Sequence, residues 1–437
     1  MKRVAIALSG GVDSLVAAIL LKRSGASLVG VFMRNWEERD EGRGQRCTAE
    51  ADYSRVRDIC AALNIPCALA DFVKDYWNDV FSHFVQAYEQ GHTPNPDILC
   101  NRHIKFSALH RYCCQHLDAD VIATGHYARV ERDEAGKARL KVATDSCKDQ
   151  TYFLSQVPQV SLARSVFPVG GLRKEEVREI ASQAGFTHVA RRKESVGLCF
   201  IGKRDFPQFI SEVSSITRQI EFLPLHLLSP SPLSVSISIS LLSSLHLLSP
   251  SLHLLSPALI LLQYIEERHG RFVTLEGRQL GWHRGHHLFT VGQRARIGGQ
   301  SQPLFVAGKD AAENTVTVVE GTHHPGLYIS SFTTSPPHWI SDNPLVTGGS
   351  LPFRCRLRHR HQAPLVDVEL VEDKEGLQVT CSNPLRAVAP GQYAVFYSGE
   401  ECLGGACITA TSPSLWQLEP KSMFTNKIMQ IILLQNG

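Results

Sequence analysis

The stretch ALSGGVDS (residues 7–14) places two glycines and two serines directly after an apolar run near the start of the chain. VAIAL is typical of a strand and SLVAAILLKRSG of a helix, so the glycines fall at a strand-to-helix turn. Backbone N–H groups in such a turn attract an anion together with the helix N-terminus, and Ser9 and Ser14 add hydroxyl donors. No lysine follows as in the Walker A motif, which predicts a phosphate-binding loop of another type. The alternative is an ordinary glycine turn.

Two cysteines stand in segments where a reactive thiol is chemically reasonable. Cys100 follows the stiff TPNPD segment (93–97), whose prolines exclude helix, and helix is predicted to resume near Ile104. A cysteine near a helix start has a lowered pKa and reacts as the thiolate. Cys199 lies between two glycines in ESVGLCFIGKRDF, a flexible, electropositive segment that suits a sulfur-carrying thiol. For each cysteine the alternative is a buried structural residue.

Four arginines alternate in RCRLRHRH, at positions 354, 356, 358 and 360. On a strand this spacing points all four side chains to one face. Such a face fits contacts with the phosphates of a nucleic acid; the alternative is a solvated edge strand protected by charge. Gln293, Arg294 and Arg296 in TVGQRARIGG form a second basic loop.

The elements that must position these residues change in kind along the chain. Strand-like and helix-like runs alternate over residues 1–130, and residues 172–187 form a further amphipathic helix pattern. This order predicts a parallel sheet covered by helices. From about residue 270 short β-rich runs alternate with turn residues. That pattern predicts an all-β domain built as a small barrel.

An uncharged segment rich in leucine and serine separates the two halves. From Phe222 to Ile265 there is no Asp, Glu, Lys or Arg, and LHLLSP occurs three times. A membrane span fits poorly because prolines interrupt the segment and no basic flank sets an orientation. A solenoid fits poorly because the repeat is short and irregular. We interpret residues 213–263 as low-complexity sequence, either a long loop or translated non-coding sequence.

Length and composition predict a globular protein of two or three domains. The 45 basic and 42 acidic side chains among 437 residues neither imply nor exclude a nucleic-acid partner. The 12 cysteines form no CxxC pair, so no structural zinc and no other tightly bound metal is predicted. The chain begins with an apolar strand rather than a signal peptide or an evident transit peptide, and we expect reduced thiols.

Several motifs together resemble those of one family, the tRNA-specific 2-thiouridylases (MnmA/TRMU family). SGGVDS itself is similar to the PP-loop of ATP pyrophosphatases, which cleave ATP between the α and β phosphates. The resemblance covers roughly residues 2–212 and 264–410, and PHWI (337–340) is most similar to mitochondrial-type members. The remaining motifs occur in the family's order: TPNPDILCNRHIKF (93–106), ATGHYAR (123–129), KDQTYFLS (148–155) and GLCFIGKRDF (197–206).

The resemblance implies an α/β fold class with three parts. We expect an N-terminal PP-loop ATP pyrophosphatase domain with a parallel sheet, adenine nucleotide alpha hydrolase-like, at residues 1–205. A small central tRNA-binding domain is expected at 206–300, interrupted by the insert, and a C-terminal β-barrel at 301–412. Residues 413–437 are expected to form a loose tail.

The same resemblance implies a role for individual positions. Cys100 corresponds to the catalytic nucleophile and Cys199 to the cysteine that carries a persulfide. Asp97 is a candidate for proton handling or base orientation, with a loop-capping aspartate as the alternative. The target base is expected to contact Asn95, Pro96 and Asp97. ATP is expected to contact Ala7, Leu8, Ser9, Gly10, Gly11, Val12, Asp13, Ser14, Met33 and Gly125. Contacts with tRNA are expected at His126, Lys148, Asp149, Gln150, Arg358, His359 and Gln392.

The implied reaction replaces the C2 oxygen of wobble uridine 34 in tRNA with sulfur. ATP, with Mg²⁺, would adenylate this poor leaving group, and the Cys199 persulfide would supply sulfur. The resemblance suggests tRNAs for Lys, Glu and Gln, and an upstream persulfide donor fed by a cysteine desulfurase relay. No membrane partner is expected, and the compartment is the mitochondrial matrix, or the cytoplasm for a bacterial-type protein.

Two other functions remain open at this point. The first is a PP-loop amide or guanidino synthetase acting on a small metabolite, which would need neither cysteine nor the basic strand. The second is a non-catalytic RNA-binding relative disabled by the insert. Cys100, Cys199 and the basic strand argue against the synthetase, and the presence of both cysteines and the phosphate loop argues against the disabled relative.

Overall fold

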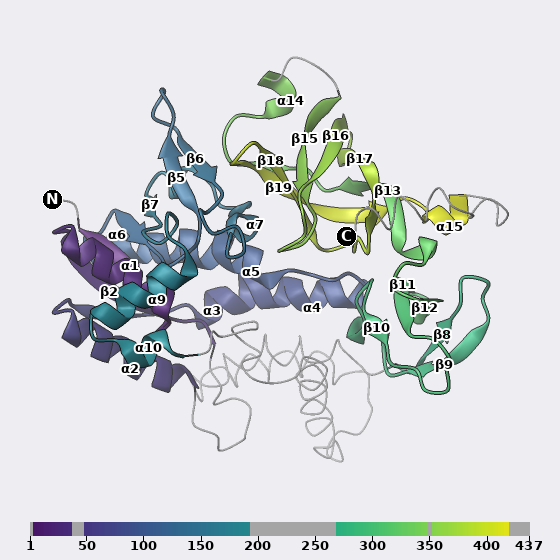
Figure 1. Cartoon of the computed structure of the whole chain (residues 1–437), viewed down its shortest axis with the longest axis horizontal. Helices are drawn as coiled ribbons and strands as arrows, with labels where there is room; N and C mark the ends of the chain where they lie inside the picture. Colours follow the sequence, from purple (N-terminus) through teal and green to yellow (C-terminus); the bar gives the residue numbers. More distant parts are fainter. Residues whose placement is uncertain (1–2, 37–47, 193–267, 348–351, 419–437) are drawn as a thin grey trace, which may run out of the picture.

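The N-terminal part of the computed structural model is a parallel sheet in the strand order β3-β2-β1-β4-β7 (Figure 1). The structure describes residues 3–36, 48–192, 268–347 and 352–418. The order reverses between β1 and β4, where ligands of open α/β sheets usually bind. The strands are β1 (Val4–Ala7), β2 (Leu28–Arg34), β3 (Cys67–Asp71), β4 (Val121–Ala123) and β7 (Ser165–Val166).

Helices cover both faces of this sheet, which confirms the expected α/β class. Alternate residues of β1 and β2 enter two separate hydrophobic clusters, because neighbouring strand side chains point to opposite faces. One cluster includes α1 (Val12–Arg23), α2 (Thr48–Ala62), α9 (Lys174–Gln183) and α10 (Thr187–Ala190). The other includes α3 (Val73–Tyr76), the π-helical η2 (Trp77–Phe81) and η3 (Cys100–Ala108), α4 (Ser82–Glu89) and α6 (Leu109–His116).

A second, smaller sheet follows in the order β10-β11-β12-β8-β9. A side chain built at Gly281 would lie 3.7 Å from Ile297, so the segment after β10 packs against β9. The sheet continues to Glu320 and therefore crosses the domain boundary expected at residue 300. Its strands are β8 (Gly270–Val273), β9 (Gln279–His283), β10 (Arg294–Ala295), β11 (Leu304–Asp310) and β12 (Thr315–Glu320).

The C-terminal part is an antiparallel barrel in the order β13-β17-β16-β15-β18-β19. Pairing of β13 with β19 closes it, and β14 (His338–Trp339) adds to β19. Closure removes exposed strand edges. The barrel strands are β13 (Tyr328–Thr334), β15 (Phe353–Arg358), β16 (Val366–Asp373), β17 (Gly376–Arg386), β18 (Tyr393–Ser398) and β19 (Glu401–Thr411).

The N-terminal part and the barrel share a sheet and a hydrophobic cluster. The hairpin of β5 (Arg129–Arg132) and β6 (Ala138–Lys141) extends the barrel sheet by pairing with β19. Arg129 donates to Glu400 at 2.8 Å across this junction. The short helices α5 (Pro96–Leu99), α7 (Thr151–Leu154) and α8 (Gln159–Leu162) bury apolar side chains in one cluster with residues of β18 and β19. The barrel therefore holds the α5–α7 region of the first domain in place.

Several predictions from the sequence concern residues that the structure does not describe. Cys199, the insert at 213–263 and the tail beyond residue 418 lie outside the described residues. The start of the expected tail is helical, because α15 (Leu415–Leu418) buries Leu415 against Leu327 and Tyr328. In the ranges described, no helix combines the length and the apolar character needed to cross a membrane.

Two buried histidines make the middle sheet sensitive to acid. Burial, together with His286, lowers the pKa of His283 to about 4 and that of His287 to about 4. Both values lie below the ordinary 6.5, so the unfolded chain binds protons that the folded chain does not. The histidines' contribution to stability is therefore complete above pH ~6.5 and is lost as the pH falls toward about 4.

We expect the melting temperature of the protein to fall between pH 7 and pH 5, with about 1–2 kcal/mol lost for each of these histidines. The variant His287→Leu should lose less stability over this range, because leucine fills the site without titrating. The exposed His323 provides the control, and His323→Gln should keep the wild-type dependence. A His287→Leu variant with the wild-type pH profile in calorimetry would contradict this explanation.

Candidate functional site

The glycine-rich turn has the backbone geometry of an anion-binding loop. Gly10 has φ +76°, which favours glycine, and Gly11 is the extended N-cap residue of α1. The Ser14 hydroxyl donates to the Gly11 carbonyl at 3.1 Å and lies 3.3 Å from the Ser9 hydroxyl. Because no side chain caps the helix, its first N–H groups remain directed into the turn. The turn can therefore present backbone and hydroxyl donors to a phosphate.

Asp13 lies in the first turn of α1, and two side chains from distant elements hold it. Lys174, which is buried at the start of α9, donates to its two carboxylate oxygens at 2.8 and 3.0 Å. The Tyr127 hydroxyl, from the loop after β4, donates to Asp13 at 2.9 Å. Lys174 and Tyr127 were not among the residues predicted from the sequence. Their contacts tie the loop to both α9 and the ATGHYAR motif.

Gly125 is packed against the phosphate loop at the point where the strand order reverses. A Cβ atom there would lie 2.6 Å from Asp13 C and 2.6 Å from Ser14 N. Only a glycine fits at that distance from backbone atoms. Met33 stands near the carboxyl end of β2, beside β3. The structure thus brings together the predicted ATP positions from three strand ends, as expected for a nucleotide site in an open α/β sheet.

Two arginines that the sequence analysis did not single out lie near the loop. The position of a Cβ at Gly10 is 3.5 Å from the Arg55 side chain, which reaches over from α2. Asp52 pairs with Arg55 and lies 3.8 Å from Arg192. Burial and the neighbouring Arg192 lower the pKa of Arg55. Positive charge at this position fits an anionic ligand; only the fold reveals it, because α2 and the loop are distant in sequence.

The TPNPD segment is helical earlier than expected. Helix α5 begins at Pro96, and η3 continues it directly through Cys100, so no break extends to Ile104. Pro96 occupies the first turn, where a missing N–H costs nothing, and the extended Asn95 is the N-cap residue. Cys100 is therefore in the second turn of a continuous helix. It is 2% exposed and shares a hydrophobic cluster with Ala7 of the phosphate loop.

The barrel holds the TPNPD segment from the other side. The Gln392 side chain donates to the Thr93 carbonyl at 2.8 Å, and the Thr93 N–H donates to the Pro390 carbonyl at 2.8 Å. The Asn95 side-chain amide donates to the side-chain amide oxygen (Oε1) of Gln392 at 3.5 Å. Gly391, with φ +90°, lies so close to Thr93 that a Cβ would approach its N atom to 2.8 Å. We define this contact of residues 390–392 with 93–95 as the barrel clasp.

The barrel clasp predicts that Gln392→Ala impairs turnover by roughly 10-fold, since small displacements of a reacting group cost rate. Nucleotide affinity should stay near wild type, because the phosphate loop lies on other elements. Single-turnover rates and ATP titrations on the same preparation measure the two effects. Gln302→Ala, at an exposed position of the middle domain, serves as the control. An unchanged rate in Gln392→Ala would mean that the clasp does not position the segment.

Asp97 sits on α5 in a partly buried position that suits proton transfer. Burial raises its pKa, and the positive fields of Lys105 and His361 partly oppose that rise. His361, from the segment after β15, lies 3.0 Å from the Asp149 carbonyl and packs on Phe153 at 4.5 Å between ring centres. The sequence analysis named His359 of this segment, as a tRNA contact, and did not single out His361. His361 is the histidine of this segment whose field reaches Asp97, whereas His359 is buried.

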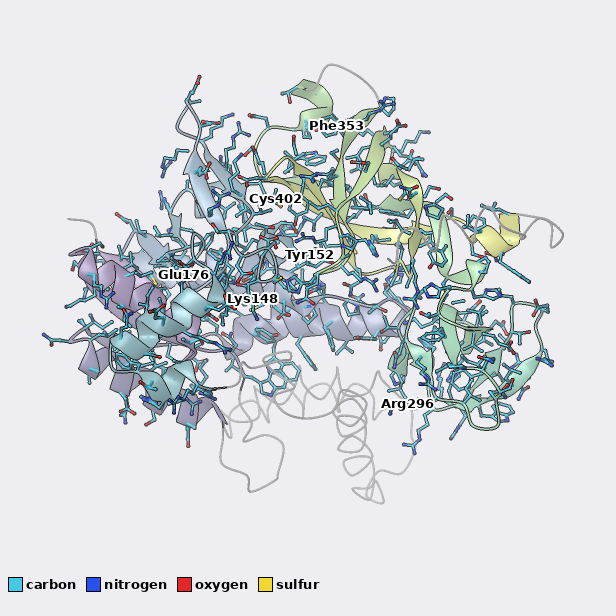
Figure 2. The ribbon with its side chains drawn as sticks, in the orientation of Figure 1. Lys148, Tyr152, Glu176, Arg296, Phe353 and Cys402 are labelled. Atoms are coloured by element: carbon cyan, nitrogen blue, oxygen red, sulfur yellow. The ribbon has the colours of Figure 1, made fainter. Side chains whose placement is uncertain are left out.

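Several predicted tRNA contacts have side chains engaged inside the protein. Asp149 accepts from Arg358 at 2.8 Å in a buried ion pair, and Gln150 accepts from the Tyr127 N–H at 2.9 Å. His126 is buried, 2.7 Å from the Thr124 hydroxyl. Burial lowers the pKa of His126 well below its usual range. These residues support the site from within, and their contact with RNA stays a prediction. Lys148, labelled in Figure 2, is half-buried and lines a cavity of about 520 Å³ beside α9.

The arginine-rich strand differs from the expected open basic face. Arg354 pairs with Glu369 at 2.9 Å, Arg356 donates to the Gly399 carbonyl at 2.6 Å, and Arg358 pairs with Asp149. Strand β15 ends at Arg358, so Arg360 lies beyond it. Spacing alone predicted a shared face, but it could not reveal the carboxylates that neighbouring strands and loops supply. We therefore do not assign this strand as a phosphate-binding face.

The glycine-rich loop lies at the switch point of a parallel sheet, and the barrel contacts the helix that carries Cys100. This arrangement is typical of a multidomain α/β enzyme with a nucleotide site. Three family models match the chain and agree with this class. The tRNA methyl transferase HUP domain matches residues 2–203, the tRNA methyl transferase PRC-barrel domain residues 259–320, and the aminomethyltransferase beta-barrel domain residues 329–408.

Relatives identify the family more closely, and the chain belongs to the tRNA-specific 2-thiouridylase family. The mitochondrial tRNA-specific 2-thiouridylase 1 of Homo sapiens is 40% identical over 446 residues, which cover 96% of this chain and 93% of that protein. The Drosophila melanogaster protein of the same name is 38% identical, covering 94% and 95%. The tRNA-specific 2-thiouridylase MnmA of Streptococcus pyogenes serotype M49 is 38% identical, covering 93% and 95%.

Proposed function

We propose that this protein is an ATP-dependent tRNA uridine 2-sulfurtransferase that converts wobble uridine 34 to 2-thiouridine. The observation that carries the proposal is the joining of two features in one domain. The phosphate loop with Gly125 provides a nucleotide site, and Cys100 shares a buried cluster with the start of that loop. Membership in the family supports tRNA as the substrate.

The first step proposed is activation of the C2 oxygen. This oxygen attacks the α phosphate of ATP, the bond to the β phosphate breaks, and pyrophosphate leaves. Ser9, Ser14 and the N–H groups at the start of α1 would hold the leaving phosphates, with Mg²⁺ as their counter-ion. Asn95 and Asp97 at the start of α5 would orient the base, and Asp97 would take up or return its proton.

The second step proposed is sulfur transfer. The terminal sulfur of a persulfide on Cys199 attacks C2 and displaces AMP, which leaves sulfur bridging Cys199 and the base. The Cys100 thiolate then attacks the Cys199 sulfur and forms a Cys100–Cys199 disulfide. The electron pair of the broken S–S bond stays on the sulfur of the base. A dithiol reductant must supply two electrons to restore the thiols. Since Cys100 is 2% exposed, its thiol must become accessible during the cycle.

We also propose the tRNA substrates, the sulfur source and the compartment of this protein. The substrates would be tRNAs for Lys, Glu and Gln, and the sulfur would come from a persulfide donor supplied by a cysteine desulfurase relay. The mitochondrial matrix fits the mitochondrial relatives, and the cytoplasm fits the bacterial one.

The products formed from ATP test the proposed function. With purified protein, unmodified tRNA, a dithiol, and a cysteine desulfurase with L-cysteine as the persulfide donor, we expect radiolabelled ATP to yield AMP and pyrophosphate, and only when tRNA is present. Formation of ADP, or of AMP without RNA in the presence of a small acceptor and ammonia, would favour a different PP-loop enzyme. Asp13→Asn should reduce AMP formation strongly, because it removes the carboxylate that Lys174 and Tyr127 hold.

A further inference from the structure

Trp282 is an exposed indole on the middle sheet. It is 65% exposed on β9, and among the described residues it belongs to none of the hydrophobic clusters. The other tryptophans are packed. Trp36 and Trp77 stack with ring centres 4.8 Å apart, Trp339 packs on the barrel core and Trp416 lies 4.8 Å from His324. An exposed tryptophan that stabilises no core is a candidate contact for a partner.

Two arginines adjoin this indole in the sheet register, and a third lies in the same domain. Arg271 on β8 is the direct cross-strand partner of Trp282, so both side chains stand on the same outer face. Arg284 directly follows β9 and is exposed. Arg296 precedes Ile297, which packs toward Gly281 of β9, and Figure 2 shows Arg296 projecting outward from this domain.

The net positive charge of the middle domain favours an anionic partner. Residues 268–320 contain seven Arg and Lys but four Asp and Glu. Along the row that starts at Trp282, register places Arg271, then Thr315, then Asp310, so the nearest carboxylate of that row is three strands away. An aromatic ring flanked by guanidinium groups is the arrangement that binds an unpaired base between phosphates.

We propose that Trp282 is a stacking platform for an unpaired base of the RNA substrate, with Arg271 and Arg284 contacting the flanking phosphates. The inference rests on the proposed function because RNA is the ligand, and it adds a contact on a sheet other than those that carry the phosphate loop and residues 390–392 of the barrel clasp. The surface lies on the outer face of β8 and β9. The alternate residues Phe272 and His283 point to the opposite face and pack in the domain core. A substitution at Trp282 should therefore leave the fold intact.

Tryptophan fluorescence and affinity test this platform directly. Unmodified tRNA should quench the wild-type emission, and the quenching should shrink in Trp282→Phe, which lacks the reporting indole but keeps a ring. Trp282→Ala should weaken tRNA binding by roughly 10-fold or more, and Trp282→Phe should recover most of the affinity. Arg271→Gln should reduce the salt dependence of binding by about one phosphate contact.

Two controls separate the platform from its alternatives. Val346→Ala changes an exposed apolar residue on α14 (Pro344–Thr347) and should bind tRNA like wild type. A fully paired RNA duplex of equal length should bind wild type and Trp282→Ala equally, because it offers no unpaired base. Equal tRNA affinity in wild type and Trp282→Ala would overturn the stacking proposal. The same result is expected if Trp282 contacts a protein instead of RNA. If wild type thiolates tRNA normally, that result leaves the proposed function standing.

Discussion

Gly125→Ala is expected to lower ATP-dependent AMP formation by at least about 100-fold. The new Cβ would lie 2.6 Å from two backbone atoms of the phosphate loop, at Asp13 and Ser14. Backbone cannot move aside as a flexible side chain can, so the start of α1 must shift. That shift would misdirect the N–H donors which the proposed mechanism uses for the leaving pyrophosphate, and one lost donor of this kind costs about 10²–10³ in rate.

Gly171→Ala is the matched control for this prediction. Gly171 lies in the same domain, but nothing stands within 4 Å of the Cβ that alanine would add. We expect it to retain wild-type AMP formation and wild-type melting. Thermal melting of Gly125→Ala shows whether the domain remains folded, and ATP binding by calorimetry locates the defect. If Gly125→Ala is folded and binds and cleaves ATP normally, the nucleotide does not bind at this turn.

Cys100→Ser is expected to abolish formation of 2-thiouridine while tRNA-dependent adenylation continues. In the proposed sequence Cys100 acts after AMP has become the leaving group, so its loss separates the two half-reactions. A hydroxyl cannot take the place of the thiolate in breaking an S–S bond. The adenylated tRNA or a bridged sulfur adduct should accumulate, and intact-mass analysis of tRNA and protein would detect either.

Cys114→Ser supplies the comparison for Cys100→Ser. Cys114 is a partly buried free cysteine on α6, which continues the helix that carries Cys100. Its sulfur lies 3.7 Å from His110, a contact that a serine hydroxyl can also make. This variant should thiolate tRNA at the wild-type rate. Full activity in Cys100→Ser, or equal losses in the two variants, would show that Cys100 is not the attacking thiol.

Local sequence predicted the first half of the fold well because its signals are local. VAIAL, the glycine turn and the apolar helix after it specify β1, the turn and α1 within a few residues. The parallel class followed from alternation of strand and helix patterns. Pro96 misled the prediction of α5, because a proline that forbids helix in its interior is favoured in its first turn.

Contacts between distant segments could not be read from the sequence. Spacing indicated an arginine face on β15, but the pairing of Arg358 with Asp149 depends on how the barrel docks. The clasp of Gln392 on Thr93 joins residues almost 300 positions apart. The middle sheet likewise crosses residue 300 because β12 pairs in parallel with β8, a connection that no local pattern signals.

The nucleoside content of tRNA after incubation with the purified protein tests the central claim most directly. Unmodified tRNA, ATP, Mg²⁺, a dithiol, and a cysteine desulfurase with L-cysteine as the persulfide donor should yield 2-thiouridine with the wild-type protein, measured by mass spectrometry after digestion to nucleosides. The product should be absent without ATP and absent with Cys100→Ser. Formation of 2-thiouridine without ATP, or its absence with wild-type protein that cleaves ATP to AMP on the same tRNA, would contradict the account.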